Sequence, residues 1–268
     1  MAIRRGLGGL EARTIADLAA EGKTLFTLGD LQAKLGSRLK ARKMASKLVK
    51  KQWLERLARG VYLVLELSAG SRPKWTEDRY YIASKLASPC YIGFYNALHK
   101  YAWTEQVPLV VNTIVTSPLK NRVIHGVEYR FIAVTKRKFF GRVKIVERGH
   151  EIEFSDPEKT IVDALDRPEY CGGMEEVAKA LFIAKETLDF PKVVSYAERS
   201  GNGAVLKRLG FLCEMMGVPL SGEIVRRIKL KATKGYALLS PRGKREGRHS
   251  SRWGLLVNVD LTKEKALA

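Results

Sequence analysis

The chain has 268 residues, and its 48 Lys and Arg outnumber its 28 Asp and Glu to give a formal net charge of +20. Hydrophobic residues make up 46% of it, which is enough for packed cores and excludes a wholly disordered basic tail. No run of about 18 uncharged apolar residues occurs, which excludes a membrane-spanning helix. The charge favours a polyanionic partner, with nucleic acid ahead of a membrane surface. A generally basic proteome or thermophilic ion-pair networks are the alternatives.

The three cysteines lie far apart, with no spacing typical of a zinc site, and an odd number argues against a disulfide framework. The four histidines have no neighbouring ligand pattern, so we expect neither a metal nor a cofactor. The N-terminal residues lack the apolar core of a signal peptide. These features predict a cytoplasmic protein with reduced thiols.

The charge is concentrated in two segments. Residues 1–68 hold 14 basic and 6 acidic side chains, and seven of the basic ones fall within 37–51, a segment without any acid. Residues 226–252 hold ten basic side chains and one acid, Glu246. The remainder of the chain is close to neutral.

Residues 37–51 have the pattern of an amphipathic helix. At about 100° per residue, Ala41, Met44, Ala45 and Leu48 gather on one face, while Lys40, Lys43, Lys47 and Lys50 lie opposite. Ser37 can cap this helix after a turn at Gly36. An ordinary solvated face mixes charges of both signs, so this one favours a polyanion.

The flanking segments predict a winged helix-turn-helix. Leu10, Ile15, Leu18 and Ala19 indicate a first helix, preceded by a floppy terminus at 6–9, and residues 27–30 form a capping box for a second helix. Two apolar runs around Gly60 predict a hairpin. In such a motif the last helix enters the DNA major groove. A three-helix module for protein contacts is the alternative.

Within this module the lysines are suited to contact phosphates. Arg38 and Arg42 are placed to form hydrogen bonds with guanine edges. Arg56 and Arg59 are placed to contact phosphate or the minor groove. The candidate DNA-contacting residues are Ser37, Arg38, Lys40, Arg42, Lys43, Lys47, Lys50, Lys51, Arg56 and Arg59.

Beyond a predicted linker at 67–74, residues 75–268 predict an α+β domain whose helical part spans about 174–230. The predicted helices are 75–87, 91–101, one beginning at 155–158, 174–186, 191–199, 203–216 and 222–230. The predicted strands are 109–116, a hairpin within 122–134 that turns at 125–126, a pair at 143–146 and 151–154, and two final strands at 236–239 and 253–259. Cys171-Gly172-Gly173 should break the chain.

No P-loop, GxSxG or dinucleotide fingerprint occurs, so we expect no enzyme. The enzymatic alternative is a metal-dependent nuclease at Asp156, Glu158 and Lys159. Helix capping explains the two acids equally well, and Lys159, Asp163 and Asp166 are otherwise expected at the surface or in caps.

Several ordered motifs resemble the AbiEi antitoxins of type IV toxin–antitoxin systems. They are YIGFYNALHKY at 91–101 followed by WTEQVP at 103–108, Gly126, SDPEKTIVD at 155–163, Gly172-Gly173, LERLARGVY at 54–62 and RWGLLVN at 252–258. Together they span about residues 10–260. Asn96 departs from the serine expected at that position.

The resemblance implies a non-enzymatic, DNA-binding antitoxin whose winged helix binds inverted repeats in its own promoter and represses the operon. Arg38, Lys40, Arg42, Lys43 and Lys47 would lie on the recognition helix, with Arg56 and Arg59 on the wing. The C-terminal domain would counter a nucleotidyltransferase-like toxin. A monomer that pairs on DNA fits this interpretation, and a stand-alone regulator is the alternative.

The second basic segment has two interpretations. Cations at 226–231 complement the dipole at the end of a helix. Arg242, Lys244, Arg245 and Arg248 lie in an expected loop at 241–251, where they would contact phosphate, RNA or an acidic toxin surface.

Overall fold

The computed structural model describes residues 4–65 and 77–267. The predicted linker at 67–74 lies outside these ranges. The chain divides into two compact units, the first comprising residues 1–88 with 123–127 and 147–150, and the second comprising the rest. No helix in the described ranges is long and apolar enough to cross a bilayer.

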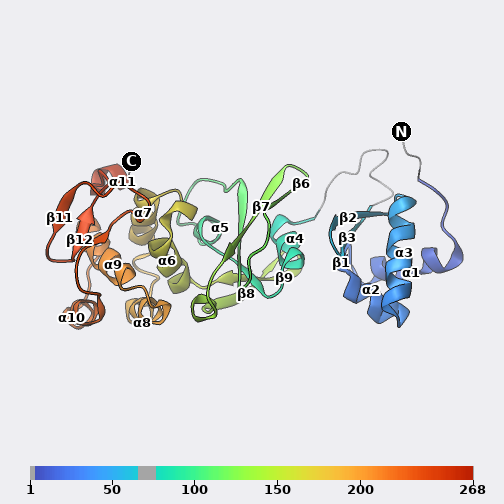
Figure 1. Cartoon of the computed structure of the whole chain (residues 1–268), viewed down its shortest axis with the longest axis horizontal. Coiled ribbons are helices and arrows are strands. Elements are labelled where there is room, and N and C mark those ends of the chain that lie inside the picture. Colours follow the sequence, from blue (N-terminus) through green and yellow to red (C-terminus); the bar gives the residue numbers. More distant parts are fainter. Residues whose placement is uncertain (1–3, 66–76, 268) are drawn as a thin grey trace. The chain divides into compact units, whose positions relative to one another are not determined.

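The first unit begins with three helices and a small sheet (Figure 1). The elements are α1 (Gly9–Ala20), β1 (Leu25–Thr27), α2 (Leu28–Leu35), α3 (Arg38–Lys50), β2 (Leu54–Ala58) and β3 (Val61–Val64). The strands lie in the order β1-β3-β2, with both pairs antiparallel. Strand β1 was not predicted, and it completes the sheet by pairing with β3.

Local sequence explains the helix boundaries. The predicted capping box is present at α2, since Thr27 Oγ1 accepts from the Asp30 amide and Asp30 accepts from the Thr27 amide. Gly36 then takes a left-handed φ of 68°, which turns the chain into α3. Leu18, Phe26, Leu31 and Leu48 form the core with the apolar face of α3. The predicted first helix is present, and Leu10 at its start is exposed.

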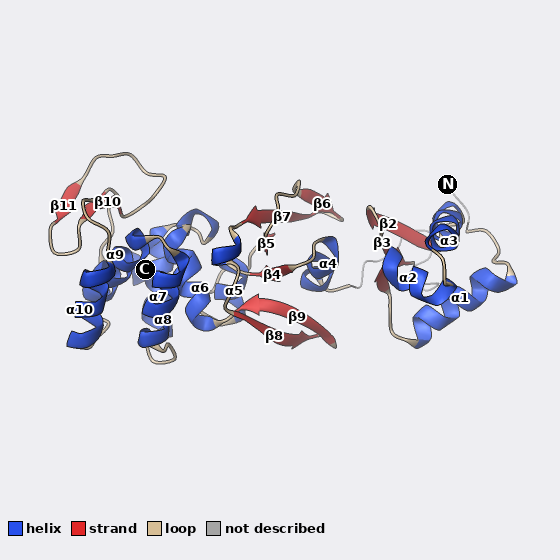
Figure 2. Cartoon of the chain, turned by 60° about the horizontal axis from the view of Figure 1, so that its bottom comes forward, coloured by secondary structure: helices blue, strands red, loops and turns tan. Residues whose placement is uncertain are grey.

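The second unit contains most of a six-stranded sheet followed by a helical block, whereas α4 (Arg79–Leu86) and the hairpin ends at 123–127 and 147–150 are grouped with the first unit (Figure 2). The sheet order is β6-β7-β5-β4-β9-β8. Its strands are β4 (Cys90–Ile92), β5 (Val110–Val115), β6 (Arg122–Ile124), β7 (Val127–Ala133), β8 (Arg142–Glu147) and β9 (His150–Ser155). Strand β4 pairs antiparallel with β5 and parallel with β9. Both predicted hairpin turns have left-handed backbone at 125–126 and 148–149.

The predicted helix at 91–101 is wrong in its first half. Cys90–Ile92 is a central strand, and only Tyr95–Lys100 (α5) is helical. The aromatic and branched residues of this short apolar run are compatible with a helix or with a strand. Its pairing with neighbouring strands makes it a strand. A Cβ at Gly93 would lie 2.6 Å from Ile114 Cδ1, so a larger residue there would require the buried Ile114 side chain to shift.

The helical block matches the prediction closely. It contains α6 (Pro157–Asp166), η3 (Pro168–Tyr170), α7 (Met174–Ala184), α8 (Phe190–Ser200), α9 (Gly203–Met216) and α10 (Gly222–Lys231), and η2 (Lys136–Lys138) lies earlier in the chain. Asp156 caps α6 with Pro157 in its first turn. Cys171 and Cys213 are buried free thiols within this block, and burial raises the pKa of Cys213 to about 12.

A small third sheet follows, in the order β10-β12-β11. Strands β10 (Ala237–Leu238) and β12 (Leu255–Val257) were predicted, whereas β11 (Arg248–Ser250) and α11 (Lys263–Leu267) were not. The segment expected as an unbroken loop at 241–251 therefore contains a strand. The mixed α+β class is confirmed by this architecture.

Candidate nucleic-acid interface

Helix α3 has two chemically different faces. Its predicted apolar face is buried at Ala41, Met44, Ala45 and Leu48. Five exposed cations form no ion pair with any residue that the structure describes: Arg38, Lys40, Arg42, Lys43 and Lys50. Because the core fixes the rotation of the helix, these cations are presented to solvent from one rigid element.

The fold brings one acid to the C-terminal end of α3. Glu11 of α1 lies 2.7 Å from Lys47 Nζ and 2.5 Å from Lys51 Nζ. Hydrogen bonds from Lys47 and Lys51 lower the pKa of Glu11 to about 2. The expectation of a basic segment without acidic neighbours is wrong here, since Lys47 and Lys51 hold α1 against α3. This contact spans about 40 residues of sequence, so no local pattern reveals it.

The N-terminal half of α3 carries two features that the sequence interpretation misjudged. Ser37 occupies the N-cap position, but its side chain makes no capping hydrogen bond. Leu39 is 62% exposed and shares the solvent-facing side with Lys43 and Ser46 by helical spacing. An apolar side chain among cations can contact a thymine methyl group in the major groove. Its position outside the apolar stripe was the signal that could have identified it.

The hairpin β2–β3 places two further cations beside this helical body. Arg56 and Arg59 are both exposed, and Gly60 forms the turn with a φ of 80°. The Leu28 amide donates to the Gly60 carbonyl at 2.7 Å. This bond anchors the turn to the start of α2, so the hairpin cations belong to the same compact body as α3.

The segment before α1 is anchored, and the expectation of a floppy terminus at 6–9 is wrong. The Arg5 amide donates to the Lys51 carbonyl at 3.2 Å, and Trp53 Nε1 donates to the Arg5 carbonyl at 2.8 Å. The Arg4 guanidinium lies 4.5 Å from the centre of the Trp53 ring. Lys51 Nζ also donates to the Gly6 carbonyl. Lys51 therefore has a structural role in addition to its charge.

The four cations of the second basic patch do not act as one group. Arg242 pairs with Glu169 at 2.9 Å and lies over Tyr170. Lys244 and Arg245 are exposed without an ion pair to any described residue, whereas Arg248 belongs to β11. The side chain of Asn258 holds the loop through the carbonyls of residues 240 and 244.

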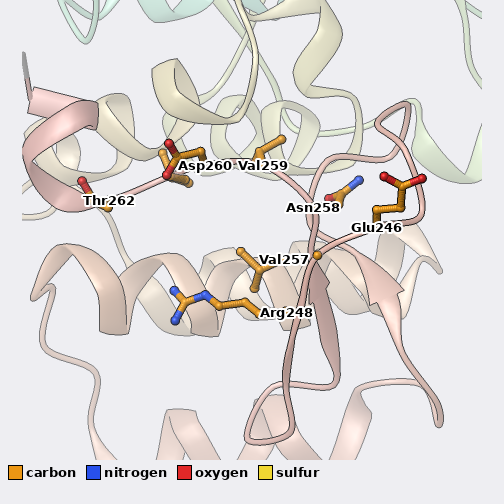
Figure 3. Close-up of a pocket in the computed structure, with 9 residues that line it drawn as sticks. Glu246, Arg248, Val257, Asn258, Val259, Asp260 and Thr262 are labelled. Carbon is orange, nitrogen blue, oxygen red and sulfur yellow. The ribbon is translucent and has the colours of Figure 1, made fainter.

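A shallow pocket of about 530 Å³ adjoins this loop (Figure 3). Glu246 and Asp260 contribute carboxylates to its lining, together with Arg248. Figure 3 shows the Arg248 side chain extending away from Glu246. Because both signs of charge line it, the pocket does not extend the cationic surface.

The residues of the nuclease alternative are engaged in structural contacts, and Lys192 pairs with both Asp156 and Glu158. Lys159 is 1% exposed and forms an ion pair with Asp163, and its Nζ donates to Tyr91 Oη at 3.2 Å. The surface positions expected for Lys159 and Asp163 are therefore wrong. Asp156 accepts from the Tyr196 hydroxyl at 2.9 Å, and Glu158 pairs with Lys192 at 2.7 Å.

Asp166 is mostly enclosed as well, paired with Lys138 and accepting from Asn202. No group of three or more His, Cys, Asp or Glu side chains suited to a metal occurs in residues 4–65 or 77–267. Asp156, Glu158, Lys159 and Asp166 are thus each held by contacts within the fold.

A known family model matches part of the N-terminal unit. Residues 13–64 match the AbiEi family. The family model is described as "Transcriptional regulator, AbiEi antitoxin", and the match runs from α1 to the end of β3. It includes all of α3 and the hairpin. The AbiEi-like motifs noted at 91–163 and 252–258 lie outside the matched range.

A solved structure of similar fold aligns with nearly the whole chain. The RV2827C protein from Mycobacterium tuberculosis aligns with a TM-score of 0.63 at 14% sequence identity, covering 98% of this chain and 95% of that protein. At this identity the likeness concerns the fold alone. No curated protein matches the sequence.

Proposed function

We propose that residues 4–65 form a winged helix-turn-helix that binds double-stranded DNA, with α3 as the recognition helix and the β2–β3 hairpin as the wing. The observation that carries this proposal is the row of exposed, unpaired cations on the solvent face of α3. The helix follows α2 through a tight left-handed turn, and a hairpin anchored to α2 flanks it. This is the order of elements in which the last helix enters the major groove. The AbiEi match over the same residues supports a transcriptional regulator.

The proposed contacts divide by side-chain chemistry. Lys40, Lys43 and Lys50 are point charges suited to phosphates, whereas Arg42 can form two parallel hydrogen bonds with one guanine. Lys47 and Lys51 should contribute less to the DNA affinity, because Glu11 already neutralises part of their charge. Arg56 and Arg59 would contact the backbone or minor groove beside the helix.

Binding to the chain's own upstream region tests the regulatory part of the proposal. Fluorescence anisotropy would compare a labelled duplex from that region, containing its inverted repeat, with a scrambled duplex of equal composition. We expect tighter binding to the native duplex at moderate salt, with two chains pairing on the repeat. Equal affinity for both duplexes would contradict autoregulation while leaving non-specific DNA binding intact.

We further propose that residues 75–268 form the antitoxin part and counter a nucleotidyltransferase-like toxin. The support is the AbiEi match over residues 13–64 of the same chain. The gene beside this one should encode such a toxin. Co-expression of residues 75–268 with that toxin should restore growth, and the AbiEi-type DNA-binding unit alone should not. Failure of the full chain to restore growth would favour a stand-alone regulator.

A further inference from the structure

A cationic pocket of about 350 Å³ lies in the second unit between α9, α10 and the turn before β12. Four of its lining residues are cations: Lys207, Lys229, Lys234 and Arg252. Its lining includes no carboxylate. It is separate from the shallow pocket of Figure 3, which Glu246 and Asp260 help to line.

Lys207 is the most enclosed of these cations. Its residue is 3% exposed, and its Nζ donates to the Gly235 carbonyl. No carboxylate within the described residues forms an ion pair with it, and burial lowers its pKa. An enclosed ammonium without a counter-charge is energetically unfavourable, so an anion entering the pocket would offset that cost.

Two glycines let the backbone approach the Lys207 ammonium closely. Gly235 and Gly254 have left-handed φ values of 76° and 60°. A Cβ on Gly254 would lie 3.2 Å from Lys207 Nζ and 3.1 Å from the Gly235 carbonyl oxygen. A side chain at this position would occupy the space beside the ammonium, so glycine keeps the base of the pocket open.

Trp253 forms a fixed wall. It is 6% exposed, and its ring packs so closely on Gly210 of α9 that a Cβ there would overlap the ring. Its Nε1 donates to Glu214, which also pairs with Arg252 at 3.1 Å. Glu214 therefore neutralises Arg252 and holds the wall, while the pocket charge comes from the three lysines.

The number of cations indicates the class of ligand. Lys229 and Lys234 are exposed at the pocket and form no ion pair with a described residue, which leaves three ammonium groups around one opening. A carboxylate offers one charge and two oxygens, whereas a phosphate group carries up to two charges and three or more acceptor oxygens. We propose that this pocket binds a phosphate group, with Lys207 at its base and Lys229 and Lys234 at its rim. The phosphate belongs to a free nucleotide or to a nucleic acid, and the proposal does not depend on DNA binding by α3.

The test uses the full-length protein and amide NMR signals of Gly235 and Gly254, which report on this pocket and not on α3. The probes are inorganic phosphate, ATP and a 5′-phosphorylated single-stranded octanucleotide, with acetate at equal ionic strength as the reference anion. We expect saturable shifts with at least one phosphate probe and none with acetate. Whichever of ATP and the octanucleotide binds more tightly identifies the source of the phosphate.

Three variants distinguish binding at this pocket from a general effect of the protein's net charge. The exposed double variant Lys229→Gln/Lys234→Gln should weaken binding about tenfold or more, and Lys207→Met should weaken it further if it folds. The control Lys120→Gln removes an exposed lysine elsewhere in the unit and should bind as the unaltered protein does. Absence of shifts with all three phosphate probes, equal shifts with acetate, or undiminished binding by the double variant would overturn the proposal. Removing the α3 lysines should leave the shifts unchanged.

Discussion

The two basic segments of this chain have similar local charge but differ in how the fold presents it. In α3 a single helix, rotated by its buried face, exposes five cations without acidic partners in the described structure. In residues 226–252 the cations are spread over α10, a loop and β11, and carboxylates pair with Arg227, Arg242 and Arg252. The fold therefore leaves the α3 cations unpaired on one helix, whereas in 226–252 it pairs three arginines with carboxylates and leaves Lys229 and Lys234 unpaired at the separate pocket described above.

The largest effect is expected from removing the α3 lysines. The triple variant Lys40→Ala/Lys43→Ala/Lys50→Ala should lose affinity for all DNA sequences, on the order of hundredfold at low salt, because three phosphate contacts disappear. Fluorescence anisotropy would measure the loss. Lys23→Ala is the matched control, since Lys23 lies in the same unit but pairs with Glu21. An equal loss in the control would show that net charge alone governs binding.

A more selective effect is expected from Arg42. Arg42→Ala should cost roughly 1–3 kcal/mol of binding free energy at one base pair and relax the preference there. Binding to a set of duplexes with single base changes would locate that pair. A uniform loss across all duplexes would instead assign Arg42 to a phosphate.

Glu11 offers a test of the contact that distinguishes Lys47 and Lys51 from the other lysines. Its pKa is about 2 in the folded chain, below the ordinary 4.5, so its carboxylate stabilises the N-terminal unit above about pH 4.5. This stabilisation should fall as the pH drops from 4.5 towards 2. Glu11→Gln should unfold at lower denaturant concentration at pH 7, and its difference from the unaltered protein should vanish near pH 2. A difference that persists unchanged at pH 2 would contradict the ion-pair account.

The smallest effect is expected from the second basic patch. Lys244→Ala/Arg245→Ala should change the affinity for the upstream duplex by less than about threefold, because these charges belong neither to the recognition helix nor to the wing and would contribute only through long-range attraction. Anisotropy at two salt concentrations would measure it. A loss as large as that of the α3 variant would assign the patch a direct DNA contact.

Local sequence predicted much of this fold because its signals are short-ranged. The capping box at Thr27, the turn at Gly36 and the apolar stripe of α3 each depend on neighbours within four residues. Strand β1 and the strand at Cys90–Ile92 were missed because their partners in the sheet lie far along the chain.

The candidate site shows the same limit. Exposure of Arg38, Lys40, Arg42, Lys43 and Lys50 follows from helical spacing, but the pairing of Lys47 and Lys51 with Glu11 does not. Likewise the sequence predicted Lys159 at the surface, whereas the fold encloses it with Tyr91, Phe140 and Asp163. The pocket around Lys207 arises from α9, α10 and the Trp253 turn, and no local motif marks it.

The central claim is that the α3 lysines neutralise DNA phosphates, and the salt dependence of DNA affinity tests it most directly. The affinity of the unaltered protein for its upstream duplex should be measured across a range of salt concentrations beside the Lys40/Lys43/Lys50 triple variant. The slope of log affinity against log salt should become shallower by about 0.9 for each lost phosphate contact. An unchanged slope in the triple variant would show that the solvent face of α3 does not lie against the DNA backbone.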